Sequence, residues 1–386
     1  MKRICIITPV YPLPEYPAYT FVEQLVNGFA DCGVECDVIA PYSKIMTFLR
    51  RKNYHPPYHY TRTTNRGNVI NVYCPPFFCV AGRKRLGIDF AMIFQSQFIK
   101  ATKKMLEKLN KEYDAFYGHF ISPAAPTVVE LGQKYNKPSY FAYGECSFDL
   151  ISNRYDLDYL RQKLKPLAGV VAVSTSNRND LITNSLIDED KIEVFPNAID
   201  SSVFYTMDRV KAREKLGIDQ DAFIAAFVGY FIPRKGTLRV SAALSKLGNV
   251  KSFFIGTGEE NPTCEGVLFK GRLPHDQIVT YLNAADIFVL PTLAEGCCNA
   301  AIEAMACGLP VISSDLPFND DVLTEENSIR IDPNDVDAIA EAIKTLRDDP
   351  VLRQKMSEKA LETAKNLTIQ KRAENILAFM ARRSDK

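Results

Sequence analysis

Two glutamates, Glu295 and Glu303, stand with seven residues between them in the stretch EGCCNAAIE. A carboxylate can accept two hydrogen bonds from a vicinal diol such as a ribose. The apolar run ADIFVL before Glu295 predicts a buried parallel strand, and Gly296 permits a tight turn from this strand into a helix. The pattern therefore places two acids around a helix start. The alternative is a pair of solvated acids on a helix surface, since Glu is a common helix former.

The helix is expected to begin near Cys298 or Asn299. Its first amides and positive dipole end would point into the crevice at the carboxyl end of the strand, where anions bind. Glu295 would then lie at a phosphate site, and Glu303 would reach another part of the same ligand. The thiols of Cys297 and Cys298 could instead serve catalysis or bind metal, but none of the four histidines is near in sequence. Small residues that fit a tight turn are the better interpretation of this pair.

The composition is that of a globular protein. The chain has 386 residues, of which 46% are hydrophobic and 24% charged, and its net charge is +1. This length suits two domains, and the near-neutral charge argues against a nucleic-acid partner. No apolar run is long enough for a membrane span, and Pro9, Pro12 and Pro14 interrupt the first one. Ten scattered cysteines without a CxxC pair suggest free thiols, so we expect a cytoplasmic protein.

Short apolar runs alternate with helical segments in two series, which predicts an α/β fold with two doubly wound, Rossmann-like domains facing a cleft. The strands expected in the first series are 3–10, 36–42, 114–120, 138–144 and 169–174, with a helix over 20–31. Those of the second series are 222–230, 251–258, 266–272, 286–291 and 309–315. A proline and small polar residues in 194–204 favour a boundary there, which gives domains 1–198 and 199–365. Residues 366–386 are expected to form a helix that packs back on the first domain.

Five motifs in order resemble the nucleotide-sugar-dependent glycosyltransferases of family 4, retaining enzymes of the GT-B fold. They are VFPNAID, FVGYFIPRKG, FFIGTG, VLFKGRLPHDQI and EGCCNAAIEAMACGLPVISSD. The resemblance is strong over 165–350 and weaker before it. It implies that the second domain binds the nucleotide sugar and that the first lies on the acceptor side.

The resemblance also implies roles for individual residues. Glu295 would face the donor sugar and Glu303 the ribose, while Arg234 and Lys235 would clamp the diphosphate. Fixed cations there would stabilise the negative charge that grows on the leaving group. The alternative for the basic pair is an exposed turn. The further donor residues implied are Gly296, Cys298 and Asn299 at the diphosphate and Gly229, Gly256, Gly258, Arg272 and Leu273 at the nucleoside. No cofactor or metal ion is expected, and neither glutamate is assigned as a general acid.

The first domain departs from the family in two places. YPLPEYPAYTFVEQL stands where relatives carry a Gly-Gly turn, so Ala18, Tyr19 and Thr20 are expected to supply the amides. Where relatives have a histidine near the reacting sugar, this chain has Glu145. We expect Glu145 to orient the acceptor or stabilise charge on the sugar ring, the alternative being a loop acid. His119 matches a family position that contacts acceptor or phosphate, although a lone histidine is often structural.

Positive charge is concentrated between Lys44 and Lys111, with fourteen Lys and Arg against two acids. The basic clusters alternate with apolar segments such as FAMIFQSQF, a pattern typical of an interfacial segment. We therefore expect an anionic membrane surface as a partner, reached through 44–111 on the inner face of the cell membrane. The alternatives are a solvated helix face and an anionic oligosaccharide site.

Together these features predict a retaining hexosyltransferase that uses a nucleoside-diphosphate sugar, with a UDP-sugar favoured over a GDP-sugar. Its acceptor would be a glycan or a polyprenol-linked lipid in cell-surface polysaccharide or glycolipid synthesis. A sugar-nucleotide isomerase or a non-catalytic binding protein of the same fold remains an alternative. A nicotinamide oxidoreductase is disfavoured because no GxGxxG follows a first strand.

Overall fold

The computed structural model describes the chain except for residues 17–18, 51–53, 81–83, 86–87 and 385–386. The chain divides into two compact units. Unit 1 consists of Met1–Phe195 together with Ile369–Lys386, and unit 2 consists of Pro196–Thr368. The divisions thus fall after residues 195 and 368, close to the predicted 198 and 365. No helix among the described residues is long and apolar enough to cross a membrane.

Unit 1 is built on an eight-stranded sheet in the order β12-β11-β10-β9-β1-β2-β5-β4. All neighbours run parallel except the β4–β5 pair. The central strands are apolar on both faces, as expected of a sheet covered on both sides. In sheet order the strands are Ile192–Val194, Gly169–Ala172, Ser139–Tyr143, Ala115–His119, Arg3–Ile7, Glu35–Ile39, Val69–Tyr73 and His59–Thr63. Two small ribbons, β3–β6 and β7–β8, pair Tyr42–Ser43 with Pro76–Phe77 and Lys84–Arg85 with Ile88–Asp89.

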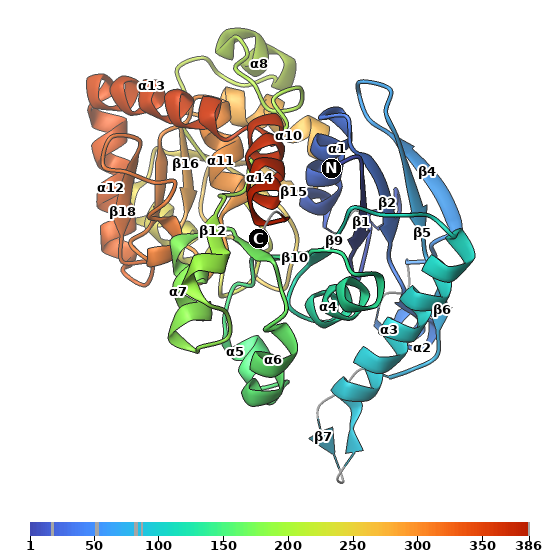
Figure 1. Ribbon diagram of the computed structural model, residues 1–386. Helices are drawn as coiled ribbons and strands as arrows, with labels where there is room; N and C mark the ends of the chain where they lie inside the picture. The colour runs from blue at the N-terminus through green and yellow to red at the C-terminus, as the bar shows by residue number, and fades with distance from the viewer. Residues whose placement is uncertain (17–18, 51–53, 81–83, 86–87, 385–386) are drawn as a thin grey trace. The chain divides into compact units, whose positions relative to one another are not determined.

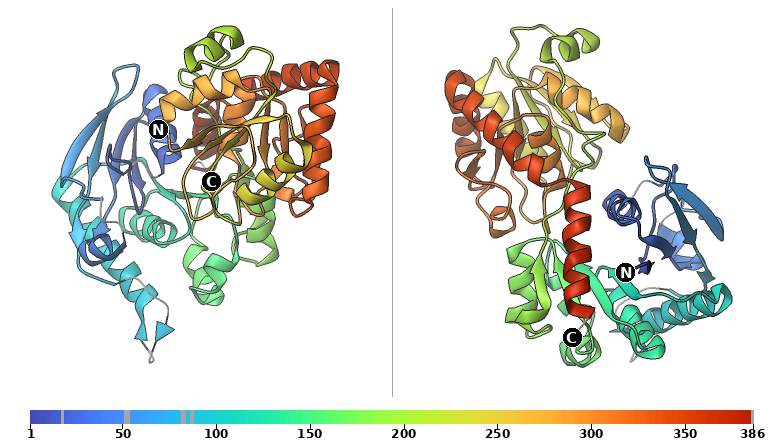
Figure 2. Two further views of the ribbon diagram at one scale, coloured as in Figure 1. Left: turned by 180° about the vertical axis from the view of Figure 1, so that it is seen from behind. Right: turned by 45° about the horizontal axis from the view of Figure 1, so that its top comes forward.

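Helices cover both faces of the unit 1 sheet. One core cluster joins the sheet to α1 and to the C-terminal α14, and the other joins it to α3, α4 and α6. Gly28 of α1 lies so close to α14 that an added Cβ would stand 2.8 Å from the Cβ of Ala373. The helices are α1 Thr20–Asp31, α2 Lys44–Arg50, α3 Phe90–Leu109, α4 Ala124–Tyr135, α5 Asp149–Ser152, α6 Leu157–Leu164, α7 Thr175–Thr183, the 3-10 turn Glu189–Lys191, and α14 Ile369–Ser384 (Figures 1 and 2).

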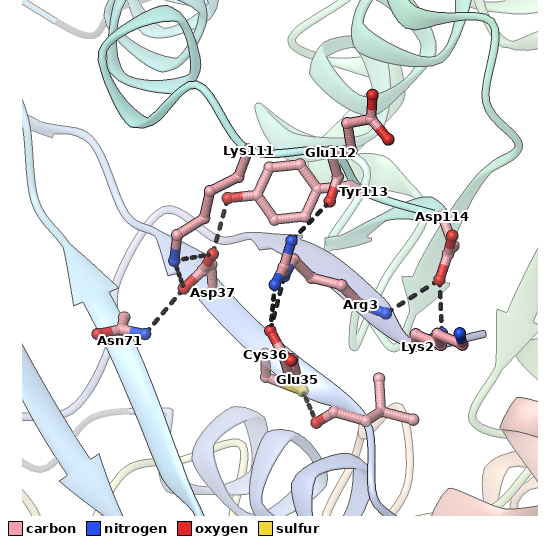
Figure 3. A network of polar contacts seen from close by, with 11 residues as sticks. Lys2, Arg3, Glu35, Cys36, Asp37, Asn71, Lys111, Glu112, Tyr113 and Asp114 are labelled. Carbon is pink, nitrogen blue, oxygen red and sulfur yellow. Dashed lines mark hydrogen bonds and ion pairs between the residues drawn. The ribbon is translucent and has the colours of Figure 1, made fainter.

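A network of polar contacts links neighbouring strands of the unit 1 sheet toward their amino ends (Figure 3). The buried Asp37 of β2 accepts hydrogen bonds on both oxygens. Lys111 Nζ lies 2.8 Å from Oδ2, Tyr113 Oη lies 2.8 Å from Oδ2, and Asn71 Nδ2 lies 3.0 Å from Oδ1. Burial, helped by the charge of Asp37, raises the pKa of Tyr113 far above its usual range. The network therefore holds a charged carboxylate inside the fold by complete pairing.

Unit 2 carries a six-stranded parallel sheet in the order β15-β14-β13-β16-β17-β18. The strands in this order are Val267–Gly271, Lys251–Ile255, Ile224–Val228, Ile287–Leu290, Val311–Ser314 and Ser328–Ile331. The helices are α8 Arg209–Leu216, α9 Thr237–Leu247, α10 His275–Ala284, α11 Asn299–Ala306, the 3-10 turn Pro317–Asn319, α12 Val336–Asp348 and α13 Pro350–Asn366. This strand order is that of a doubly wound nucleotide-binding fold.

A second buried carboxylate closes unit 2 at the amino end of β16. Asp286 Oδ1 lies 2.7 Å from Arg209 Nη1, and Asp286 Oδ2 lies 2.8 Å from both Arg213 Nη2 and the backbone nitrogen of Ile224. The side chain of Arg213 is only 1% exposed. Asp286 thus forms a buried ion pair with Arg213 and links the start of β16 to the start of β13 through the nitrogen of Ile224.

Candidate donor site at the switch point of unit 2

The strand order of unit 2 reverses between β13 and β16, and ligands of doubly wound sheets bind outside the carboxyl ends of the strands at this point. The segment after β13 brings Arg234 and Lys235, and the segment after β16 brings Glu295. Residues separated by about sixty positions therefore meet at one edge of the sheet. This position is the one that the sequence predicted for the three side chains.

Glu295 is the centre of this meeting point. Its Oε1 atom accepts hydrogen bonds from Arg234 Nη1 at 3.0 Å and from Thr292 Oγ1 at 2.8 Å, and it also pairs with Lys235 Nζ. Its side chain is 13% exposed. The hydrogen bonds and ion pairs described for this carboxylate all end on Oε1. The carboxylate thus fixes two cations and keeps one oxygen available.

The helix that follows, α11, begins at Asn299 with Cys298 as its N-cap, within one residue of the predicted start. No side chain caps its first amides. The Oδ1 atom of Asn299 is buried and has no hydrogen-bond partner among the described residues. Unpaired amides at a helix start and the two nearby cations make a suitable environment for a phosphate group.

The vicinal cysteines do not have the properties of a nucleophile. Both Cys297 and Cys298 are buried, and burial raises the pKa of the Cys298 thiol to about 11. A thiol with this pKa is protonated at neutral pH and therefore unreactive. All ten cysteines are free thiols. In the part of the chain that the structure describes, no group of three or more His, Cys, Asp or Glu side chains could hold a metal ion.

Glu303 lies one turn into α11, and its Oε1 atom is 3.1 Å from Nε2 of His275 at the start of α10. The side chain of Glu303 is 13% exposed and that of His275 is 40% exposed. The sequence analysis assigned no role to His275 and none to Thr292. A signal existed for Thr292, since it directly follows the β16 strand three residues before Glu295. The approach of His275 depends on the packing of α10 near α11, which no local pattern reveals.

The residues predicted to bind the nucleoside lie at the carboxyl ends of the neighbouring strands. Arg272 is exposed and Leu273 half-buried after β15. Gly256 and Gly258, after β14, approach the segment after β13. An added Cβ would lie 1.8 Å from the Gly229 carbonyl oxygen at Gly256, and 2.1 Å from the Phe231 carbonyl oxygen at Gly258. The contact of these two loops alone therefore requires both glycines.

In unit 1, the sheet reverses its order between β1 and β9, so the corresponding edge lies after these two strands. Of the three residues expected there, Ala18 lies outside the described residues. Tyr19 is the N-cap of α1 and has a left-handed backbone with φ of 65°, and Thr20 is the first residue of the helix. A left-handed tyrosine is unusual and strained. The ring of Tyr19 packs against Phe21 and Phe120.

His119 ends β9 and is 3% exposed. Its ring lies among those of Phe21, Tyr117 and Phe120, and its Nε2 atom has no hydrogen-bond partner among the described residues. Burial lowers the pKa of His119 to about 3, helped by the charge of Arg372. The imidazole is therefore neutral at physiological pH.

Glu145 follows β10, and its carboxylate is turned toward backbone amides of its own unit. Oε1 accepts from the nitrogen of Ile121 at 2.8 Å, and Oε2 accepts from the nitrogen of Gly144 at 3.1 Å. Burial raises the pKa of Glu145 to about 7, against the lowering effect of these amides. Both oxygens already have partners, so the fold accounts for this acid without a ligand.

The basic segment 44–111 does not form one free surface. Arg62, Lys103 and Lys111 pair with Glu23, Glu130 and Asp37. Two of the basic clusters in this segment, RRK at 50–52 and RKR at 83–85, lie largely outside the described side chains. The apolar stretch 90–98 forms the start of α3, where Ala91 and Phe98 are buried in the core cluster. Two apolar side chains of the stretch thus pack inside unit 1, whereas Ile93 is 42% exposed, and contact of this segment with a membrane stays a prediction.

The most exposed apolar side chains described in this segment lie on α2 and after β6. Phe48 is 78% exposed, Leu49 57%, and Phe78 69%. The β3–β6 pairing joins the strand before α2 to the strand before Phe78. Lys44 Nζ lies 5.4 Å from the centre of the Phe78 ring. A basic residue and large apolar side chains thus stand together on the surface of unit 1.

Comparison with known proteins agrees with this architecture. The family model "Glycosyl transferases group 1" matches residues 208–363, and the model "Glycosyltransferase Family 4" matches residues 18–203. TuaC of Bacillus subtilis, named as a teichuronic acid biosynthesis glycosyltransferase, is 25% identical over 94% of this chain and 93% of its own length. The capsular polysaccharide biosynthesis glycosyltransferase CapM of Staphylococcus aureus is 30% identical over 55% of this chain and 61% of its own length.

Solved structures share the fold over nearly the whole chain. Sucrose-phosphate synthase of Thermosynechococcus elongatus has a TM-score of 0.77 at 20% identity and covers 99% of both chains. Anabaena HepE, solved in complex with UDP, has a TM-score of 0.72 at 15% identity and covers 99% of this chain and 100% of its own. The two family models divide between the two halves of the chain, as the two Rossmann-like units do. The chain therefore belongs to the family 4 glycosyltransferases and has the GT-B fold.

Proposed function

We propose that this glycosyltransferase moves a hexose, with retention of configuration, from a nucleoside-diphosphate sugar to a glycan or polyprenol-linked acceptor. A UDP-sugar is the favoured donor, and the product would serve cell-surface polysaccharide or glycolipid synthesis. The observation that carries the proposal is the convergence of Arg234, Lys235 and Glu295 beside the uncapped start of α11. The names of TuaC and CapM and the UDP complex of HepE support the choice of reaction and donor.

The chemistry explains why cations and amides are needed. The bond between the anomeric carbon and the diphosphate oxygen breaks, and its electron pair stays on the diphosphate. The acceptor hydroxyl oxygen forms the new bond, and its proton passes to the leaving diphosphate in a front-face route. Arg234, Lys235 and the α11 amides would stabilise the charge as it develops. Glu295 would hold both cations in place and offer its Oε2 atom to a hydroxyl of the sugar.

Ligand-induced thermal stabilisation tests the donor. UDP, GDP, ADP, CMP and NAD are each added to the wild type, to Glu303→Ala, and to Glu341→Ala as a control on an exposed acid of the same unit. A ligand at a hundredfold excess over its Kd adds about 2.7 kcal/mol of stability. We expect one nucleoside diphosphate to stabilise the wild type and the control but to lose most of this effect in Glu303→Ala. Equal responses from all three proteins would contradict the assignment of Glu303.

A measurement of turnover distinguishes a glycosyltransferase from an isomerase and from a non-catalytic binding protein. A donor sugar labelled at the anomeric carbon is incubated with lipid and glycan acceptors, and the anomeric configuration of the product is read by NMR. Transfer with retention supports the proposal. Interconversion of the free nucleotide sugar would instead identify an isomerase, and donor binding without any transfer would favour a binding protein.

The membrane association belongs to the same proposal, and its contact surface lies within the segment 44–111. The surface formed by Lys44, Phe48, Leu49 and Phe78 combines apolar side chains with a basic one, a combination suited to an anionic bilayer interface. The exposed Lys100 and Lys104 of α3 add positive charge to the same unit. The inner face of the cell membrane is the location we propose for a lipid-linked acceptor reaction.

Sedimentation with vesicles of phosphatidylglycerol and phosphatidylcholine tests this surface. We expect binding at low salt, partial release at high salt, and a strong loss of binding in the double variant Phe48→Ser/Phe78→Ser. Val351→Ser is the matched control, because Val351 of unit 2 is as exposed as Phe48, at 78%. Wild-type protein that ignores acidic vesicles at every ionic strength would refute membrane association and leave the donor assignment intact.

A further inference from the structure

The contact between His275 and Glu303 has a geometry that points beyond the donor site as described. His275 Nε2 reaches only one oxygen of Glu303, at 3.1 Å. Among the described residues, this contact is the side-chain hydrogen bond found for the Glu303 carboxylate. A carboxylate with one oxygen anchored and the other available presents a fixed acceptor to a ligand hydroxyl.

The imidazole is itself held in place. The ring of Phe204 packs against it edge to face, with 4.9 Å between ring centres. The charged groups facing it are Glu303 from α11, Asp200 from the segment before α8, and Asp276 from its own helix. The nearby Cys307 is a neutral thiol, because burial raises its pKa well above the usual range. Among the described residues, the charges that act on His275 are thus carboxylates, which favours the protonated ring.

We propose that His275 is a positioning residue that holds Glu303 for the ribose of the donor nucleotide, and that it does so most firmly when its ring is protonated. This inference rests on the proposed function, because it assigns a partner to the ribose-binding acid. His275 would not touch the reacting atoms. It would restrict the Glu303 carboxylate to one rotamer, so that less conformational freedom is lost when the ribose binds.

The direction of the pH effect follows from the surroundings of the ring. Burial alone would lower the pKa of His275, but the hydrogen bond and charge of Glu303, with Asp200 and Asp276, outweigh burial and raise it above 6.5. Charge-assisted hydrogen bonds are roughly twice as strong as neutral ones. Nucleotide affinity should therefore be highest when the ring is charged and should fall as the pH rises through this raised pKa.

The experiment measures the Kd of the best-binding nucleoside diphosphate by calorimetry between pH 5.5 and 8.5. It compares the wild type with His275→Gln, which keeps a neutral donor near the Nε2 position, and with His275→Phe, which has none. His59→Gln, on an exposed histidine of unit 1, controls for the loss of a histidine as such. Protonation of the ligand phosphates affects all four proteins alike, so the differences between them report on His275.

We expect wild-type affinity to fall by about threefold to tenfold across this range relative to His275→Gln, which should bind with a flat profile. His275→Phe should bind about tenfold more weakly than the wild type at pH 6. The same pH profile in the wild type and His275→Gln would overturn the proposal. If the wild type binds no nucleoside diphosphate at all, the proposed function fails instead.

A second readout needs no nucleotide. The titration of the His275 ring is followed by NMR in the wild type and in Glu303→Gln. Pairing with Glu303 predicts that the pKa of the ring falls in the variant, because its hydrogen-bond acceptor loses its charge. If the pKa of the His275 ring is the same in the wild type and in Glu303→Gln, the two side chains do not interact. This result would overturn the proposal even where a His275 variant folds poorly.

Discussion

The carboxylates at the two ends of the strands are used differently. Toward the amino ends, Asp37 in unit 1 and Asp286 in unit 2 have both oxygens engaged by cations and hydrogen-bond donors. At the carboxyl ends of unit 2, Glu295 and Glu303 each have partners on one oxygen only. All four acids are near positively charged or ionisable groups, so charge pairing alone does not distinguish a structural acid from a binding acid. The two kinds of acid differ in whether one carboxylate oxygen is left without a described hydrogen-bond partner.

The physical reason is the cost of burying charge. A buried carboxylate is stable only when hydrogen bonds replace its lost water on both oxygens. An acid that accepts a ligand would keep part of this capacity open and remain partly exposed, and the 13% exposure of Glu295 and Glu303 is consistent with the role proposed for them. Substitutions at the two ends should accordingly separate stability from binding.

The largest effect is expected at the amino end of unit 2. Asp286→Asn leaves the Arg213 guanidinium, 1% exposed, without its counter-charge. Breaking a buried pair in this way costs about 3 to 5 kcal/mol of unfolding free energy. Urea unfolding measures the loss. Asp337→Asn, whose side chain is 79% exposed beside Lys246, is the control and should change stability by less than about 1 kcal/mol.

At the carboxyl end of unit 2, Glu295→Gln should have the opposite effect, a loss of activity with little loss of stability. The variant weakens the hold on Arg234 and Lys235, so transfer should slow by about 100-fold to 1000-fold. Its unfolding free energy should stay within about 1 kcal/mol of wild type. Steady-state kinetics and urea unfolding on the same preparation test both statements. A large stability loss with normal turnover would place Glu295 with the structural acids and break the comparison.

His119 provides a test at the carboxyl end of unit 1, where it is a buried base. Its folded-state pKa is about 3, below the unfolded value of 6.5, so the unfolded chain binds the proton first. The stability contribution is complete above about pH 6.5 and is lost as the pH falls, by about 2 kcal/mol at pH 5. His119→Phe should remove this part of the acid sensitivity.

Thermal unfolding between pH 5 and 8 measures the His119 effect. His55→Gln, on an exposed histidine, serves as the control for losing a histidine as such. Identical pH profiles of the wild type and His119→Phe would mean that the ring reaches water or a ligand. The burial found for it would then not describe the protein in solution.

The smallest effect is expected at an exposed pair of the amino end. Arg3 Nε lies 2.8 Å from Glu35 Oε2, but the Glu35 side chain is 69% exposed. Glu35→Gln should change the unfolding free energy by less than about 1 kcal/mol, and less still at high salt. A loss of unfolding free energy as large as that of Asp286→Asn would contradict this expectation. It would show that the contribution of an acid to stability depends on its place in the network of Figure 3 and not on its burial.

Much of the fold could be predicted from the sequence because the central strands are apolar on both faces. The predicted helix 20–31 coincides with α1, and the runs around Ile4 and Phe288 form β1 and β16. Strand β5 was missed because Val69–Tyr73 owes its place to pairing with β2 and β4. The surroundings of the apolar run 90–98 could not be predicted, because a helix that covers a sheet and an interfacial helix share one periodicity.

The donor site divides in the same way. Glu295, Arg234 and Lys235 lie in the loops that follow two neighbouring strands, and the carboxyl ends of neighbouring parallel strands meet, so their proximity could be inferred. The partners of Glu145 could not, because the sequence does not show that the carboxylate turns back toward the amides of Ile121 and Gly144. Nor could the pairing of Asp37 with Lys111, which joins positions 74 residues apart.

The return of the chain from unit 2 to α14 has a consequence for synthesis on the ribosome. Ala373, Ile376, Phe379 and Met380 belong to the core cluster that includes β1 and α1. The core of unit 1 lacks these side chains until residues 369–384 are translated, after the whole of unit 2. Unit 2, which is continuous in sequence, has all its strands earlier. Unit 1 therefore completes its core after unit 2, although most of it is translated first. Until then its apolar side chains are exposed, and a chaperone would be needed at this stage.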